Sequence, residues 1–252
     1  MVQAGAIVHL GSGLIIYGDY YRGIGWHFED FNWNDQPDVR ADDVPRPLAH
    51  GNFPSETYLE SRDLNMPGFV VAKSHSLLLK EKNKLNRLRR RIVRVTVEEP
   101  GLTTWADAEV RAVAFDDHGF APEARFRLSL YMADPRKYGK SERVFSSGET
   151  VFHRGNADAA PDVTVTGNMP SGYSIQGPGG KHYDVAQALG AGQTHRIDFE
   201  TGYLYRNGAL QPATAVSRAE TWLVPPGTGF PMTLAPASGT GTLATKVPYT
   251  ST

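Results

Sequence analysis

The chain has 252 residues, 40% of them apolar, with a formal net charge of −1 and with 26 Gly and 17 Pro. This length and apolar content suffice for one large all-β domain or two modest ones, and the Gly and Pro count favours short strands joined by turns. The absence of Cys excludes disulfides, thiolate metal sites and cysteine nucleophiles. The near-neutral charge provides no bulk attraction to nucleic acid or acidic membranes.

Two short apolar runs begin the chain, Ala6–Leu10 and Leu14–Tyr17, and Gly11 and Gly13 lie between them. This pattern predicts a β-hairpin at the start of a sheet. No Lys or Arg precedes the first run, so we expect no secretory signal peptide. No run approaches the roughly 20 apolar residues of a membrane span, so we expect no membrane insertion.

The stretch from Glu29 to Asp63 differs in character from its surroundings. It holds nine acids, three cations and four prolines. Such a composition predicts a long surface excursion, and long loops of compact proteins are often contact surfaces. A merely solvated loop is the alternative interpretation.

A strand predicted at Gly68–Lys73 leads into a helix near residues 76–91. Apolar residues recur at helical spacing, at Leu78, Leu85, Leu88 and Ile92. The other positions are strongly basic: Lys80, Lys82, Lys84, Arg87, Arg89, Arg90, Arg91 and Arg94 accompany the single acid Glu81. No aromatic residues interleave with these cations, which disfavours nucleic-acid binding. A solvated face is one interpretation, and complementarity to the acidic stretch before the helix is the other.

Three further strands are predicted before the middle of the chain, at Ile92–Val97, Val110–Ala114 and Phe126–Met132. Asp134-Pro135 ends the last of them, and Gly139 allows the chain to turn. This break predicts a boundary between a first domain, residues 1–140, and a second, residues 141–252. The polar residues of the break either fix the turn or meet a neighbouring subunit: Asp134, Arg136, Lys137 and Tyr138.

The second half contains only short strand signals, most of them separated by Gly, Pro or Asn. This spacing predicts a β-sandwich or jelly roll of about a hundred residues. The predicted strands are Arg143–Phe145, Val163–Thr166, Tyr173–Gln176, Thr194–Phe199, Tyr203–Arg206, Trp222–Val224 and Met232–Leu234.

Catalytic signatures are missing from the sequence. The eight His are scattered without metal-ligand spacing, and no G-x-S-x-G elbow or phosphate loop occurs. We therefore expect no catalytic residue, no metal and no cofactor, and a hydrolase is the least favoured class. Six side chains of the second half are either core and interface residues or a sugar-stacking platform: Tyr173, His182, Tyr183, Tyr203, Tyr205 and Trp222.

Four stretches resemble the distal tail (Dit-like) proteins of long-tailed bacteriophages. They are LYMADPRKYG at 130–139, HRIDFETGYLYRNG at 195–208, SRAETWLVPPGTGFPMTL at 217–234 and HGNFPSETYLESRDLNMPGFVVAKS at 50–74. These stretches sample both halves of the chain. The resemblance is therefore to the whole architecture.

The resemblance implies a mainly β protein with an N-terminal, ring-forming β domain carrying one helix and a C-terminal galectin-like β-sandwich. It implies a homo-hexameric ring that joins the tail tube to the tip or hub complex in the virion, assembled in the host bacterial cytoplasm. Tape-measure protein, and later DNA in transit, would pass through the ring. Galectin sugar-binding patterns are absent, because Trp222 is followed by Leu-Val-Pro.

In such a ring, the basic helix and the acidic excursion would fix the register between subunits through their opposite charges. The candidate interface residues on the helix are Arg87, Arg89, Arg90 and Arg91. The main alternative function is a carbohydrate-binding adhesin that recognises a host surface, with Tyr173, Tyr183 and Trp222 as glycan contacts.

Overall fold

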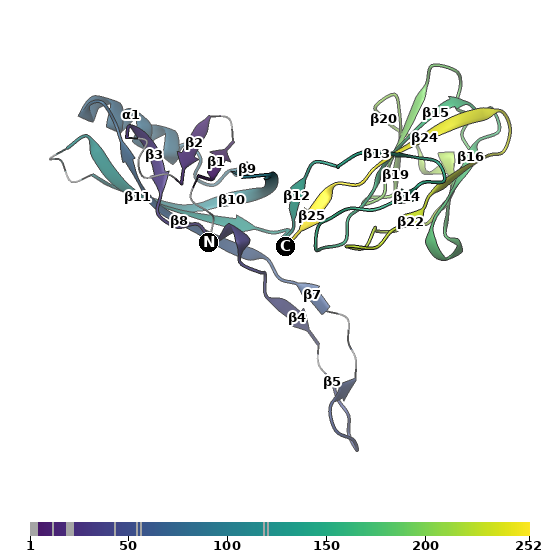
Figure 1. Ribbon diagram of the computed structural model, residues 1–252, viewed down its shortest axis with the longest axis horizontal. Helices are drawn as coiled ribbons and strands as arrows, with labels where there is room; N and C mark the ends of the chain where they lie inside the picture. The colour runs from purple at the N-terminus through teal and green to yellow at the C-terminus, as the bar shows by residue number, and fades with distance from the viewer. Residues whose placement is uncertain are drawn as a thin grey trace. The chain divides into compact units, whose positions relative to one another are not determined.

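The computed structural model describes residues 5–11, 13–18, 23–42, 44–53, 55, 57–117, 119 and 121–252. Asp43 and Glu56, counted above among the acids of the excursion, lie outside these ranges. The chain forms two compact units, residues 1–137 with Thr252 and residues 138–251. Strands make up most of the regular structure, and the described residues contain one α-helix (Figure 1), which confirms the mainly β fold class.

Unit 1 is built on a closed seven-stranded barrel in the order β11-β8-β3-β2-β1-β9-β10, closed by the pairing of β10 with β11. All neighbouring pairs are antiparallel except the parallel pair β2 and β3. The strands are β1 (Ile7–Leu10), β2 (Leu14–Tyr17), β3 (Gly25–Phe28), β8 (Arg62–Val71), β9 (Ile92–Glu99), β10 (Leu102–Asp117) and β11 (Glu123–Met132).

Strict alternation along β11 shows why these residues form a barrel. Phe126, Leu128, Leu130 and Met132 are buried, while the residues between them face outward. One face of each strand therefore packs inside the barrel, and the polar face remains in solvent. The β1–β2 hairpin is also as predicted, with Leu10 opposite Leu14.

The helix α1 (His75–Asn86) packs on the barrel through Leu78 and Leu85, which are fully buried. Ser74 caps its first turn by accepting a hydrogen bond from the Leu77 amide. Trp26 on β3 donates its indole N–H to Glu81 at 2.8 Å, which ties the barrel to the helix. Among the described residues, no helix is both long and apolar enough to cross a membrane.

The helix is shorter than the predicted 76–91. The residues after Asn86 form a turn in which Arg90 has a positive φ of 63° and donates its amide to the Val110 carbonyl. This contact with β10 ends the helix although the basic run continues. Ile92 was wrongly predicted to lie on the buried face; it begins β9 and is 77% exposed.

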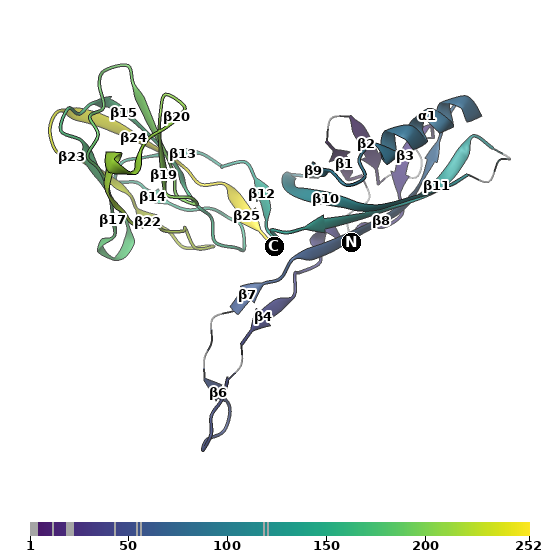
Figure 2. The same ribbon diagram turned by 180° about the vertical axis from the view of Figure 1, so that it is seen from behind.

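A two-stranded arm leaves the barrel of unit 1 (Figures 1 and 2). The arm consists of two successive antiparallel strand pairs. Near its base, the Glu60 amide donates a hydrogen bond to the Asp38 carbonyl. The predicted surface excursion is thus a hairpin over most of its length. Its strands are β4 (Val39–Ala41), β5 (Val44–Pro45), β6 (Asn52–Phe53) and β7 (Thr57–Leu59).

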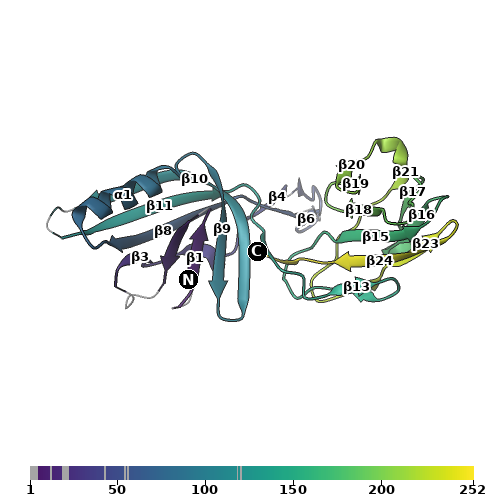
Figure 3. The ribbon, with the colours of Figure 1, turned by 90° about the horizontal axis from the view of Figure 1, so that it is seen from above.

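Unit 2 contains a six-stranded sheet in the order β13-β24-β15-β18-β19-β20 and a four-stranded sheet in the order β21-β17-β16-β23, all antiparallel (Figure 3). The first sheet comprises β13 (Val144–Ser146), β24 (Thr240–Lys246), β15 (Asp162–Asn168), β18 (Thr194–Asp198), β19 (Tyr203–Arg206) and β20 (Ala209–Leu210). The second comprises β21 (Val216–Ala219), β17 (His182–Val185), β16 (Tyr173–Gln176) and β23 (Thr233–Pro236).

The remaining elements are short. β14 (Thr150–Val151) pairs with β22 (Phe230–Pro231). Three 3-10 turns, η1 (Asn32–Asn34), η2 (Pro178–Gly180) and η3 (Ala213–Ala215), and the strands β12 (Lys137–Gly139) and β25 (Tyr249–Ser251) complete the described elements.

One apolar core joins the two sheets of unit 2. Val165 and Ile197 from the larger sheet and Ile175 and Val185 from the smaller sheet belong to the same buried cluster. The sheets therefore form the two layers of a β-sandwich. Trp222–Val224 is not a strand, although Val224 bridges to Ala159. The strand β24, a mainly polar run, was not predicted from the sequence.

A buried His–Tyr pair links β18 and β16 inside this core. His195 is fully buried, and its Nδ1 lies 3.0 Å from the Tyr173 hydroxyl. Burial, with a smaller effect of the Arg206 charge, lowers the pKa of His195 to about 4. Its neutral form is therefore favoured by folding.

We expect the pair to make unit 2 acid-sensitive. The unfolded chain binds the extra proton below about pH 6.5, so stability present above that pH is lost as pH falls towards 4, by up to about 3 kcal/mol. His195→Phe should lose about 1–2 kcal/mol at pH 7, because the Tyr173 hydroxyl loses its partner. It should also show a shallower loss between pH 6.5 and 4 in urea unfolding. Equal slopes for both proteins would contradict this assignment.

Candidate interaction surfaces

The arm exposes large apolar side chains along its whole length. Leu48 at the tip is completely exposed, and Val44 and Phe53 are each more than half exposed. The Arg46 guanidinium lies 5.6 Å from the Phe53 ring centroid. An exposed apolar hairpin of this kind is typical of a surface that another molecule covers.

The base of the arm is anchored by two buried cations. Arg62 and Lys137, each only 5% exposed, both donate to the Trp33 carbonyl, at 2.8 and 3.2 Å. The Trp33 indole donates to the Thr104 hydroxyl at 3.0 Å, which fixes the fully buried ring. Burial, and then the Arg62 charge, lower the pKa of Lys137 to about 8.

The anchor has two consequences for the predictions. The excursion begins with core residues, since Phe31 and Trp33 are fully buried, so only its later part is a surface feature. Lys137 was predicted as an interface residue, but its side chain is buried inside unit 1. Arg62 was not predicted as a structural residue, because its partner Trp33 lies far from it in sequence.

A basic patch follows α1. Its members Arg87, Arg89, Arg90 and Arg91 are all mainly exposed, and within the described part of the chain none of their guanidinium groups has an ion pair or hydrogen bond. By contrast, Arg94 pairs with Asp107 at 3.0 Å. These four residues were predicted from the sequence as contacts between subunits. Within the described residues of their own subunit, no acidic group neutralises their charges.

A pocket of about 320 Å3 adjoins the basic patch. Its floor is apolar and its rim cationic; the lining residues are Leu10, Gly13, Leu14, Lys84, Arg87, Leu88 and Arg91. The pocket and patch together fit a segment that carries both apolar and acidic side chains.

The Asp134–Arg136 turn explains two other predicted interface residues. Arg136 donates from Nε and Nη2 to the two carboxylate oxygens of Asp134, both at 2.9 Å, and the Arg136 amide donates to the same carboxylate at 3.1 Å. These bonds fix the turn after β11, as one of the two interpretations expected. Tyr138 is partly buried.

The three aromatics proposed as glycan contacts lie inside unit 2. Tyr173, Tyr183 and Trp222 are each at most 4% exposed. The Tyr183 hydroxyl donates to the Gly202 carbonyl, and Trp222 packs against Phe199 with ring centroids 4.6 Å apart. Their burial supports the core interpretation and weighs against a sugar platform made of these residues.

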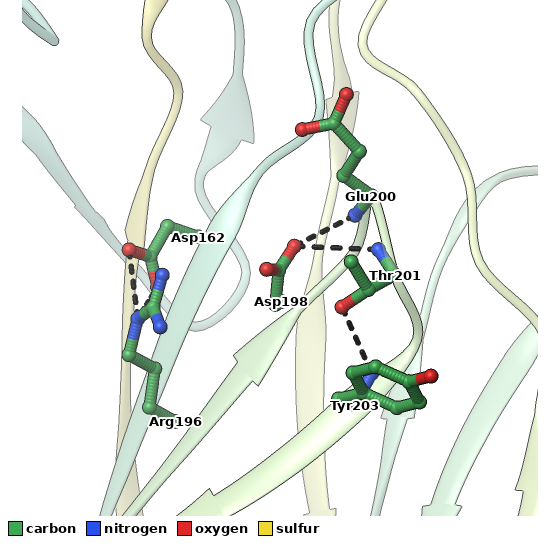
Figure 4. A network of polar contacts seen from close by, with 6 residues as sticks. All are labelled: Asp162, Arg196, Asp198, Glu200, Thr201 and Tyr203. Carbon is green, nitrogen blue, oxygen red and sulfur yellow. Dashed lines mark hydrogen bonds and ion pairs between the residues drawn. The ribbon is translucent and has the colours of Figure 1, made fainter. Parts of the chain in front are cut away.

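One turn of unit 2 is held by an extended polar network (Figure 4). An Asp198 carboxylate oxygen accepts from the Glu200 and Thr201 amides at 3.0 and 3.4 Å. Gly202 donates to the Asp198 carbonyl and has a φ of 73°, a conformation that favours glycine. These hydrogen bonds hold the turn between β18 and β19, which carries Glu200 and leads into Tyr203.

The described residues contain no group of three or more His, Asp or Glu arranged to hold a metal ion.

Comparison by sequence finds no matching protein-family model and no matching curated protein. Comparison by structure places the fold among proteins of phage adsorption apparatus and baseplates. Two structures of the phage P2 baseplate in its activated conformation, with Ca and with Sr, match with TM-scores of 0.55 and 0.53 at 9% and 10% identity. Each match covers 96% of this chain and 97% of the other.

A further match is SPP1 Dit, described as a paradigm of the hub adsorption apparatus in Gram-positive infecting phages. It aligns with a TM-score of 0.72 at 14% identity, over 97% of this chain and 99% of that chain. At this identity the likeness concerns the fold, and it extends over both units. The resemblance to distal tail proteins is thereby confirmed at the level of the fold.

Proposed function

We propose that this chain is a structural, non-enzymatic component of a bacteriophage tail tip, a distal tail protein that assembles into a homo-hexameric ring. The observation that carries the proposal is the whole-chain similarity to SPP1 Dit, which covers both units of this chain and nearly all of the other. Fold alone does not define function. The surfaces of unit 1 add independent support.

The arm and the basic patch have complementary properties that suit contact between subunits. The arm carries exposed apolar residues and the acids Asp38, Asp42 and Glu60, and the patch carries unpaired arginines beside an apolar pocket. An arm that lies on the patch of the next copy makes a head-to-tail contact, and such contacts form a ring where the rotation between successive copies closes. Asp134, Arg136 and Tyr138 remain candidate contacts of the same ring.

In this proposal the ring joins the tail tube to the tip or hub complex. The tape-measure protein, and later DNA, pass through it, and assembly takes place in the host cytoplasm. The second domain keeps the proposed galectin-like sandwich, attached to the ring-forming first domain. The carbohydrate-binding adhesin is less favoured, because its three proposed contact residues are buried.

Native mass spectrometry of the full chain tests the proposal. We expect a species of six times the 27.6 kDa subunit mass. The expected species should persist on dilution into the low micromolar range. A chain that stays monomeric at every concentration, alone and with the tail tube and hub proteins of the same phage, would contradict the ring.

A further inference from the structure

The arm differs in charge between its base and its tip. The tip, residues 44–53, has the sequence VPRPLAHGNF, which contains one Arg and one His and no acid. The acids Asp38 and Glu60 lie at the base, where their sequence neighbours Val39 and Leu59 are exposed. The base therefore has the acidic and apolar character that suits the basic patch, whereas the tip is apolar and cationic.

The tip presents an apolar surface on a closed turn. Val44 lies opposite Phe53 in the pair of β5 with β6, and both side chains are more than half exposed. Beyond this pair the Arg46 amide donates to the Gly51 carbonyl at 3.1 Å, which closes the turn. Leu48 lies within that turn and is completely exposed. A turn that is closed before it binds loses less conformational entropy when another surface covers it.

The pocket beside the basic patch does not suit this tip. Lys84, Arg87 and Arg91 line that pocket, and Arg46 would add a fourth cation to them. Because the Arg46 guanidinium lies beside the Phe53 ring, burial of Phe53 also brings this charge into the contact. Like charges that face each other across a contact disfavour it. The tip therefore requires a second surface, one that is apolar and has no cation.

A pocket of about 520 Å3 in unit 2 has these properties. It lies at β20 and β21, the edge strands of the two sheets. Among the described residues that line it, Glu200 is the only charged one, so no Lys, Arg or His is present. Its volume is that of a small-molecule site, which leaves room for the Leu48 side chain and its neighbours. The apolar lining residues are Leu204, Leu210, Pro212, Ala213, Val216 and Ala219.

We propose that the arm tip of one copy inserts into this pocket of a second copy, with Leu48 as the apolar anchor. The single acid of the lining gives the pocket the charge opposite to that of Arg46. The inference rests on the proposed function, because it adds a second contact between copies of the same assembly. The base of the arm lies on the basic patch of unit 1, and the tip fills the pocket of unit 2.

Cysteine cross-linking tests the contact on the full chain, which has no Cys of its own. One copy carries Ala49→Cys, next to the anchor Leu48, and a second copy with a different affinity tag carries Ala213→Cys at the pocket. Both positions are exposed. The two copies are produced in one cell, so that assemblies contain both, and are treated with a short bismaleimide.

The matched control replaces Ala213→Cys with Ser146→Cys. Ser146 is also exposed, and it lies on β13, at the edge of the larger sheet opposite to β20. We expect the Ala49→Cys and Ala213→Cys pair to cross-link at least about tenfold faster than the control pair, because a held contact raises the effective concentration of the two thiols.

Substitutions in the tip show whether the cross-link depends on the proposed contact. Leu48→Ser should slow the reaction to the rate of the control pair, whereas Leu48→Met, which keeps a large apolar side chain, should retain most of it. Arg46→Glu should slow the reaction severalfold, and Arg46→Lys should leave it nearly unchanged, because it keeps the charge.

Native mass spectrometry of the same samples distinguishes this inference from the ring itself. Hexamers in which the pocket pair and the control pair cross-link at equal rates would overturn the tip contact and leave the ring. Fast cross-linking that depends on Leu48 but occurs without hexamers would support the tip contact and contradict the ring. Monomers that do not cross-link, alone or with the tail tube and hub proteins of the same phage, would contradict both.

Discussion

A chain in which Val44, Leu48 and Phe53 are all replaced by serine should be a monomer, whereas the unchanged chain should be a hexamer. All three side chains are more than half exposed in the single subunit, so they add little to its own stability. In a ring each becomes buried, and full burial of one such side chain is worth about 1.5–3 kcal/mol. The loss of this burial free energy from all three side chains should prevent the subunits from associating. Native mass spectrometry at equal protein concentration measures the change.

The control for this triple variant removes exposed apolar residues outside the arm. Val144 and Leu223 are each more than 40% exposed in unit 2, and their replacement by serine should leave the hexamer intact. Thermal unfolding should show similar stability for all three proteins. Hexamers formed normally by the arm variant would exclude the arm as a contact between subunits.

Charge reversal of the basic patch should have the second large effect. Replacement of Arg89, Arg90 and Arg91 by glutamate places acids opposite the acids of the neighbouring arm, so rings should be lost. The loss should be strongest at low salt, where repulsion is least screened. The same three positions changed to lysine should keep the ring, because the charge is retained. Sedimentation at low and high salt distinguishes these outcomes.

A compensating reversal sharpens this test. Lysine at Asp38, Asp42 and Glu60 should also weaken the ring, and its combination with the glutamate patch should restore a substantial part of it. Lys181→Glu with Lys246→Glu, at two exposed cations of unit 2, is the control for charge reversal elsewhere on the surface. If the combined variant restores no ring, the patch and the arm do not contact each other, even if each of them is needed for assembly.

The sequence predicts elements well where local pattern and packing agree. Leu128 and Leu130 alternate with polar residues in β11, and burial follows that alternation. The end of α1 depends instead on a distant contact, the Arg90 amide with the Val110 carbonyl, which no local pattern contains. The buried Trp33 likewise depends on Arg62 and Lys137, remote in sequence.

The candidate surfaces show the same division. The four arginines after α1 stand out in the sequence as a basic run, and the structure adds that their own subunit leaves them unpaired. Composition alone cannot tell Tyr183 from Tyr203, since both lie in short strands. The alternation of faces along each strand distinguishes them. Tyr183 lies on the buried face of β17, whereas Leu204 occupies the buried face of β19 and its neighbour Tyr203 therefore faces outward.

Electron microscopy of the purified full chain tests the ring most directly. Negatively stained particles should show closed rings with six-fold symmetry in end-on views, and the arm variant should show none. Closed rings of another symmetry, or isolated subunits both alone and with the tail tube and hub proteins of the same phage, would contradict the proposed hexamer.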